Sequence, residues 1–212
     1  MCWDILKGPD FDLTRPKVQN IIKGWLSSGA IRAFHMGFPC SSWSRARDQP
    51  NGPPRLRSLD YIWGLPSLAP HDANKVNDGN VLLKFVVRFC NLAIRREIPW
   101  TIENPALSYA WAAPPMQRLL ANHRGGVEWR LINSGTIEYC IFGTPWRKST
   151  TFKSFNVDLT WMQNYRCTGH QCRFTGKKHQ VLFGKFKGTF LTSRSEAYPP
   201  TGRGCSPAGP GG

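Results

Sequence analysis

Two residues that could carry out covalent and acid–base chemistry each follow a short apolar segment. Cys40 comes after Pro39 and the apolar run 31–36, and Glu103 lies in the sequence "IPWTIENP". The carboxyl ends of neighbouring parallel strands lie at one edge of a sheet. A thiolate at this edge is a nucleophile, and a carboxyl group beside it, in its protonated form, is a proton donor for the same substrate ring. The simpler alternative is a buried structural thiol and a solvated carboxylate.

The elements that must position these residues alternate between strand and helix. Pro16, capped by Thr14, begins a helix, and the run 31–36 is typical of a buried strand. An irregular segment, 43–77, precedes a helix that opens near Asp78. The later elements are the strand of "IPWTIENP", a helix at 114–122, and strands at 127–132, 139–142 and 150–155. This order predicts an α/β sheet with crossover helices, formed by residues 1–194, and a disordered Pro/Gly-rich tail, 195–212.

The charge of the chain indicates a polyanionic partner. It has 28 Lys and Arg residues against 13 Asp and Glu, a net charge of +15. Nucleic acid is the commonest such partner, although a basic surface can also serve solubility alone. Five arginines on basic loops are candidates for phosphate contacts, namely Arg45, Arg47, Arg55, Arg57 and Arg147.

Cysteine usage and hydropathy indicate the setting of the protein. The seven cysteines form an odd, irregularly spaced set, which argues against a disulfide framework. No apolar run reaches the length of a membrane span, and the first residues lack the pattern of an export signal. We expect an intracellular protein, in a nuclear or cytoplasmic compartment that the sequence does not distinguish, with no membrane partner.

Several short motifs resemble those of one enzyme family. "GFPCSSWS", residues 37–44, resembles the Pro-Cys loop of the cytosine-5 DNA methyltransferases, and "ENP", residues 103–105, resembles that family's Glu-Asn-Val. Further similarities lie, in family order, at Trp3-Asp4, Asp12-Leu13-Thr14, Gly79-Asn80-Val81-Leu82 and Phe142-Gly143-Thr144-Pro145.

The resemblance implies a fold and a reaction. The fold is a partial Rossmann-like methyltransferase sheet. Cys40 would attack C6 of a cytosine flipped out of double-stranded DNA, and Glu103 would hold N3 and the exocyclic amine. Lys148 stands where the family has the first arginine of a basic motif, and we count it with the catalytic residues. S-adenosylmethionine would supply the methyl group, bound by Trp3, Asp4, Asp12, Leu13, Phe38, Pro39 and Val81.

One part of the family pattern is absent from this sequence. The resemblance begins after the family's opening Phe-x-Gly-x-Gly loop, so we expect a domain incomplete at its N-terminus. Another chain or an upstream segment would then supply the rest of the cofactor site. The alternative is a catalytically inactive, nucleic-acid-binding remnant of such an enzyme.

A separate group of residues has metal-ligand character. Cys167, His170, Cys172 and His179 lie within a short basic segment. Their spacing fits no zinc module that we can name, and solvated Cys and His residues are common on basic loops. We therefore assign no metal ligand from the sequence, and leave a zinc-bearing nucleic-acid module as a third alternative. Cys2, Cys90 and Cys140 are interpreted as structural thiols, and His35 as a core histidine.

Overall fold

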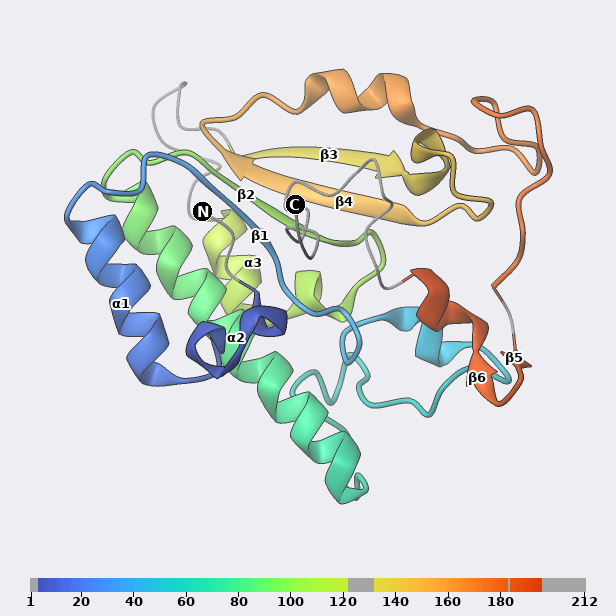
Figure 1. The fold of residues 1–212 in the computed structure, drawn as a ribbon, viewed down its shortest axis with the longest axis horizontal. Helices are drawn as coiled ribbons and strands as arrows, with labels where there is room; N and C mark the ends of the chain where they lie inside the picture. Colours follow the sequence, from blue (N-terminus) through green and yellow to red (C-terminus); the bar gives the residue numbers. More distant parts are fainter. Residues whose placement is uncertain (1–3, 122–131, 183, 196–212) are drawn as a thin grey trace, which may run out of the picture.

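The computed structural model describes residues 4–121, 132–182 and 184–195, which form a mixed α/β fold (Figure 1). Trp3 and residues 127–131 of the strand expected at 127–132 lie outside the described residues. So does the tail expected at 195–212, except for Ser195, which ends a 3-10 helix. None of the helices in the described ranges is long and apolar enough to cross a membrane.

A four-stranded sheet forms the centre of the molecule. Strands β1, Phe34–Gly37, and β2, Trp100–Pro105, are parallel neighbours. Strand β4, Ser149–Phe155, pairs antiparallel with β2, and β3, Ile132–Glu138, pairs antiparallel with β4, which gives the order β1-β2-β4-β3. The expected α/β class is confirmed, with a sheet that is mixed in direction. A second, two-stranded sheet joins β5, Lys185–Phe186, to β6, Thr189–Phe190.

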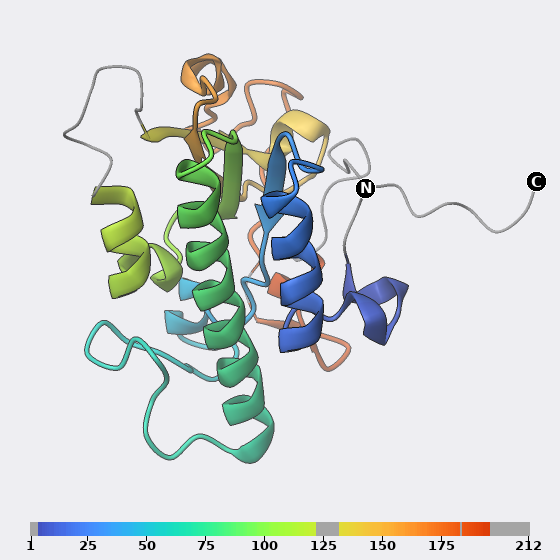
Figure 2. The same ribbon diagram turned by 90° about the vertical axis from the view of Figure 1, so that its left-hand side faces the viewer.

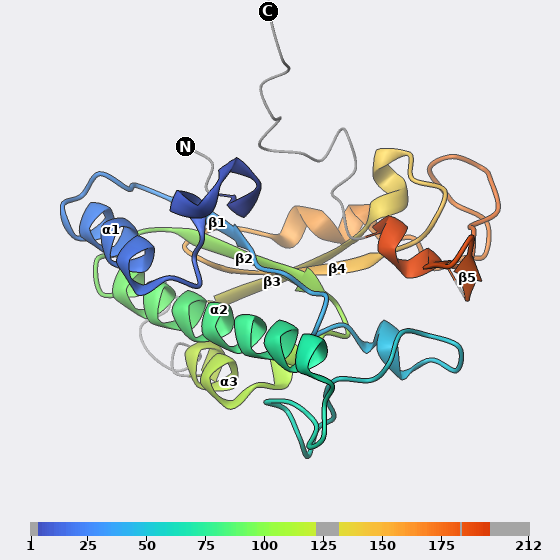
Figure 3. The ribbon, with the colours of Figure 1, turned by 60° about the horizontal axis from the view of Figure 1, so that its bottom comes forward.

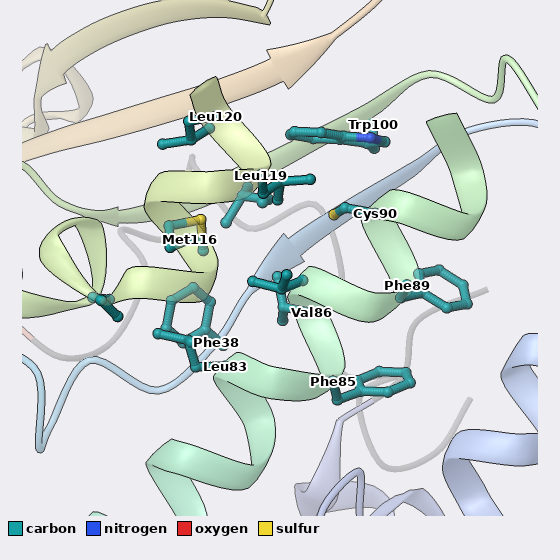
Figure 4. Packing of buried hydrophobic residues seen from close by; sticks show 14 of the residues in the cluster. Phe38, Leu83, Phe85, Val86, Phe89, Cys90, Trp100, Met116, Leu119 and Leu120 are labelled. Atoms are coloured by element: carbon teal, nitrogen blue, oxygen red, sulfur yellow. The ribbon is translucent and has the colours of Figure 1, made fainter. Parts of the chain in front are cut away.

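Three α-helices lie on one face of the large sheet (Figure 3). They are α1, Pro16–Ser27, α2, Pro70–Ile94, and α3, Pro114–Ala121. Helix α2 is the crossover between the parallel strands β1 and β2 and runs beside α1 (Figure 2). The main core lies between these helices and the sheet, where Leu83, Val86 and Cys90 of α2 face Trp100 of β2 and Met116 of α3 (Figure 4).

Short 3-10 helices occupy many of the connections. They are η1, Ile5–Lys7; η2, Pro9–Phe11; η3, Arg45–Asp48; η4, Tyr109–Ala112; η5, Tyr139–Phe142; η6, Thr160–Tyr165; and η7, Leu191–Ser195. Of these, η6 covers the other face of the sheet, where Leu159 and Met162 pack on Ile137 of β3.

Three details differ from the sequence prediction. Helix α2 begins at Pro70 rather than near Asp78, because its first turns are polar and give no apolar period to detect. The expected strand 139–142 is the 3-10 helix η5, which ends at the left-handed Gly143. At α1 the N-cap is Arg15, while the Thr14 hydroxyl donates to Asp12 at 2.7 Å.

Candidate active site

The register of the two parallel strands brings the candidate catalytic segments together. Gly37, the last residue of β1, is the direct partner of Glu103 in β2. The chain then runs through Phe38 and Pro39 to Cys40 at the same edge of the sheet. Strand alternation explains the placement of Glu103, because its neighbour Ile102 faces the helix-covered core and Glu103 therefore faces the other side. Glu103 is only 6% exposed.

Tyr139 contacts the candidate carboxylate and was not predicted from the sequence. Its hydroxyl donates to Oε1 of Glu103 at 3.4 Å, within the buried end of the sheet. Burial raises the pKa of Tyr139, and the negative charges of Glu103 and Cys40 raise it further. The Tyr139 phenol therefore interacts electrostatically with both candidate catalytic groups. A tyrosine in a segment with strand-like composition gives no signal of this contact, which depends on where η5 leaves β3.

Asn104 contacts the loop of residues 38–44, which we call the Cys40 loop, from the opposite face of the strand. Its side chain is 1% exposed, and Nδ2 donates to the carbonyl of Phe38 at 3.1 Å. The Cys40 carbonyl in turn accepts from the backbone N–H of Trp43 at 2.9 Å and of Ser44 at 2.8 Å, which closes a tight turn after the thiol. The "ENP" motif therefore performs two tasks, since Glu103 faces the site and Asn104 fixes the loop.

Arg57 supports the same loop, and its predicted contact with phosphate is corrected. The side chain is 1% exposed and donates five hydrogen bonds, to both oxygens of Ser42 and to Ile62, Val76 and Asn80. Its guanidinium also stacks 3.4 Å from the ring centre of Trp43. Burial lowers the pKa of Arg57 to about 9, which leaves it charged at neutral pH. Its donors are used inside the protein, so Arg57 is a structural residue of the loop.

Gly79 allows the loop to lie directly against α2. The Trp43 indole donates to the Gly79 carbonyl at 3.3 Å. A Cβ at position 79 would lie 2.5 Å from the Ser42 Oγ and 3.0 Å from the Trp43 Nε1. The family-like sequence starting at Gly79 therefore lies inside α2 and not at the helix start expected near Asp78. Its glycine is required by close packing.

Of the three candidate phosphate-binding arginines that precede or follow Asp48, two contact its carboxylate. Arg45 and Arg55 contact the Asp48 carboxylate at 3.1 and 3.0 Å, with side chains 49% and 51% exposed. Tyr109 donates to the same carboxylate at 2.8 Å. Arg47 donates to the carbonyls of Ser41 and Pro54, both at 2.7 Å. Arg45 and Arg55 therefore present their guanidinium groups at the surface. Arg47 instead links the backbone at Ser41 to the backbone at Pro54.

The two candidate basic residues after η5 have different partners. Lys148 Nζ lies 4.7 Å from the ring centre of Tyr139 and donates to the carbonyl of Ser195 at 2.8 Å. Lys148 thus contacts Tyr139, and Tyr139 in turn contacts Glu103. Arg147 is exposed and donates to the carbonyls of Cys167 and Thr168 at 3.2 and 2.9 Å. Contact of Arg147 with phosphate stays a prediction.

The residues expected at the methyl donor have other roles. Asp4 is exposed and caps η1 by accepting from the N–H of Leu6 at 3.0 Å. Asp12 accepts both hydrogen bonds of Thr14, and Leu13 packs on the main core. These residues fold the connection into α1, and Trp3 lies outside the described residues.

The remaining residues of the expected cofactor set lie in three different surroundings. Phe38 is buried in the main core, and Pro39 is exposed. Val81 lies inside α2, far from its first turn. Anionic groups bind to the unpaired N–H groups at the start of a helix, and Val81 is not at such a position. A cavity of about 410 Å³ lies nearby, but residues 63–80 line it. Neither this cavity nor the one beside α3 is lined by the residues expected at the donor, so their binding of S-adenosylmethionine stays a prediction.

The cysteine-rich segment is arranged differently from the sequence expectation. Cys167, Cys172 and His179 come together, but the fourth member of the group is Cys140 of η5 and not His170. His35 also departs from the expectation, because it is exposed on the sheet face opposite the helices, with Nδ1 2.8 Å from the hydroxyl of Thr101.

Comparisons with known proteins give no relative for this chain. No family model, no curated protein and no solved structure matches it.

Proposed function

We propose that this chain carries the cytosine-binding and nucleophilic part of a DNA cytosine-5 methyltransferase, on part of a Rossmann-like methyltransferase sheet. The observation that carries the proposal is the pairing of Gly37 with Glu103, because it brings the Cys40 loop and the carboxylate to one edge of a parallel strand pair. This edge is where open α/β sheets place their functional groups. The motifs "GFPCSSWS" and "ENP" support the same function.

The chemistry assigned to the chain begins with addition to the pyrimidine ring. The Cys40 thiolate forms a bond with C6 of a cytosine that has left the base stack, and the electrons of the C5–C6 double bond shift toward C5 and the ring. Glu103 holds N3 and the exocyclic amine and stabilises the charge that develops on the ring. Tyr139 positions Glu103 through its hydrogen bond.

The activated ring can react without a methyl donor. C5 of the adduct accepts a proton from solvent, then loses its original proton, and the Cys40–C6 bond breaks to regenerate cytosine and thiolate. The net change is exchange of one hydrogen at C5, with no oxidant or reductant involved. This partial reaction requires the cytosine pocket alone.

S-adenosylmethionine, the donor that the resemblance implies, would need a site from elsewhere. Among the described residues, β1 is an edge strand of the large sheet, with β2 on one side and no strand on the other. We propose that an upstream segment or a second chain adds to this edge and supplies the cofactor-binding strands. Unpaired strand edges are the places where sheets are extended.

The double-stranded DNA partner is proposed from charge. Arg45 and Arg55 present exposed guanidinium groups close to the Cys40 loop, and the chain has a net charge of +15. Phosphate contacts of this kind position a protein on DNA without reading its sequence.

The test is exchange at cytosine C5 in the absence of a methyl donor. Duplex DNA labelled with tritium at C5 is incubated with the protein, and tritium released to water is counted. The proposal expects release that Cys40→Ser abolishes and Glu103→Gln reduces by at least about 100-fold, the scale of lost electrostatic stabilisation in an active site. DNA binding without release by the wild type would support the inactive remnant instead, and would refute the proposed reaction.

A further inference from the structure

Three cysteines and a histidine form a cluster away from the candidate active site. Cys140 comes from η5, and Cys167, Cys172 and His179 come from the loop that follows η6. Their sulfur and ring nitrogen atoms all lie within 4.8 Å of one another. Both segments lie beyond the same end of β3 and β4 (Figure 1).

The three thiols are buried in one another's company. Cys140, Cys167 and Cys172 are 0%, 1% and 2% exposed and form a packing cluster separate from the two hydrophobic clusters of the fold. All three are free cysteines. Two thiols of a surface loop and one of η5 have little reason to be buried against each other unless their sulfur atoms bind one common ion.

The backbone of the loop is folded to present two of the ligands. The N–H of Cys172 donates to the carbonyl of Lys177 at 2.8 Å, and the N–H of Gly176 donates to the carbonyl of Cys172 at 2.8 Å. A bridge between Gln171 and Lys178 closes this turn. The N–H of His179 donates to the carbonyl of His170, so Cys172 and His179 lie diagonally across a small hairpin from one another.

The other two ligands are fixed through Glu138. Its carboxylate is 1% exposed and accepts from the N–H of Cys167 at 2.8 Å, while Arg166 contacts it at 3.2 Å. Cys140 follows Glu138 closely along the chain, in η5. A single buried carboxylate thus joins the segment that carries Cys140 to the start of the loop.

The orientation of His179 is that of a metal ligand. Its Nδ1 lies 3.1 Å from the carbonyl of Gly169, and its Nε2 lies 3.6 Å from the Cys167 sulfur. A proton on Nδ1, donated to the carbonyl, leaves the lone pair of Nε2 facing the thiols. Metal-binding histidines are commonly held this way, with the second nitrogen donating to a carbonyl or carboxylate.

We propose that Cys140, Cys167, Cys172 and His179 bind one Zn²⁺ ion as a structural site. Three thiolates and one imidazole match the soft, four-coordinate ligand set of structural zinc, and four protein ligands leave no position for water or substrate. The ion would fasten the loop to η5, whose first residue is Tyr139. The site would thereby help hold the tyrosine that contacts Glu103, but its existence does not depend on the proposed reaction.

The test measures metal content and ligand identity in the full chain. Protein purified under reducing conditions is expected to contain one zinc per chain by elemental analysis. Replacement by Co²⁺ should give the absorption of a tetrahedral site and a thiolate charge-transfer band. His179→Ala is expected to weaken Zn²⁺ affinity by more than the about 10- to 100-fold that is lost when a residue that only orients a metal ligand is replaced.

Two matched variants separate binding from folding. His179→Cys should retain zinc and strengthen the thiolate band of the Co²⁺ protein, whereas His170→Ala, at an exposed residue outside the cluster, should bind metal like the wild type. Chelation of the wild type should increase hydrogen exchange in residues 166–180. Reduced wild-type protein that takes up no Zn²⁺, or equal losses of affinity in the alanine variants of His170 and His179, would overturn the assignment.

Discussion

The packing of the Cys40 loop on α2 makes a sharp prediction for Gly79→Ala. Inside a helix, alanine is favoured over glycine by about 1 kcal/mol, so helix propensity alone predicts stabilisation. The structure predicts the opposite sign, because the new Cβ would lie 2.5 Å from the Ser42 Oγ and 3.1 Å from the Arg57 Nη2. These neighbours are held in place by the buried hydrogen bonds of Arg57 and cannot move freely.

The expected magnitude follows from two opposing effects. Overpacking of a well-ordered site costs about 1–3 kcal/mol, and the propensity gain offsets about 1 kcal/mol of it. Gly79→Ala is therefore expected to lower the free energy of unfolding by about 1 kcal/mol. Gly24→Ala is the matched control, since Gly24 is exposed in α1 and nothing lies within 4 Å of its added Cβ. That variant is expected to gain about 1 kcal/mol.

Urea unfolding followed by circular dichroism measures both variants, which should differ by about 2 kcal/mol. Hydrogen exchange should also become faster in residues 40–57 for Gly79→Ala only, because the loop is displaced from the helix. A Gly79→Ala protein as stabilised as Gly24→Ala, with unchanged exchange in this segment, would refute the close packing of loop and helix.

Three further predictions concern charge and burial. Arg57→Met should lower the free energy of unfolding by about 3–5 kcal/mol in urea titrations, because the five acceptors of a buried cation lose their donor; a change below 1 kcal/mol would contradict its structural role. Tyr139 has a raised pKa, so above pH 10 the folded state keeps a proton that the unfolded state loses, and stability falls as pH rises. Tyr139→Phe should lack this part of the alkaline loss, and parallel pH–stability curves for the two proteins would argue against a buried phenol. Arg45→Ala combined with Arg55→Ala should reduce the slope of log affinity for DNA against log salt by about 2, and an unchanged slope would remove both from the phosphate contacts.

The parts of the fold that the sequence predicted have strong local signals. Pro16 marks the start of α1, and the short apolar runs before Cys40 and through Trp100 contain the parallel strands. Residues at strand ends can be placed at one edge of a sheet from topology alone, so Cys40 and Glu103 were assigned to the same region. Their pairing through Gly37 confirms that the two segments are neighbours.

The errors arose where a residue's role depends on partners distant in sequence. Arg57 has the composition of a basic surface loop, yet Ser42, Val76 and Asn80 surround it, and spacing does not reveal such a pocket. Cys140 likewise gave no local signal as a ligand, because it is separated from the cysteine-rich segment by β4. Only the antiparallel return of the chain through β4 and η6 brings it to the cluster.

The central claim, that Cys40 is the nucleophile that attacks cytosine, can be tested by mapping a covalent bond. The protein is incubated with duplex DNA containing 5-azacytosine, in which a ring nitrogen in place of C5 makes C6 more electrophilic. The protein is then denatured and digested with a protease, and the masses of its cysteine-containing peptides are measured by mass spectrometry. Our account predicts a nucleotide adduct on the peptide that contains Cys40, absent from Cys40→Ser. An adduct on another cysteine, or none on DNA that the protein demonstrably binds, would contradict it.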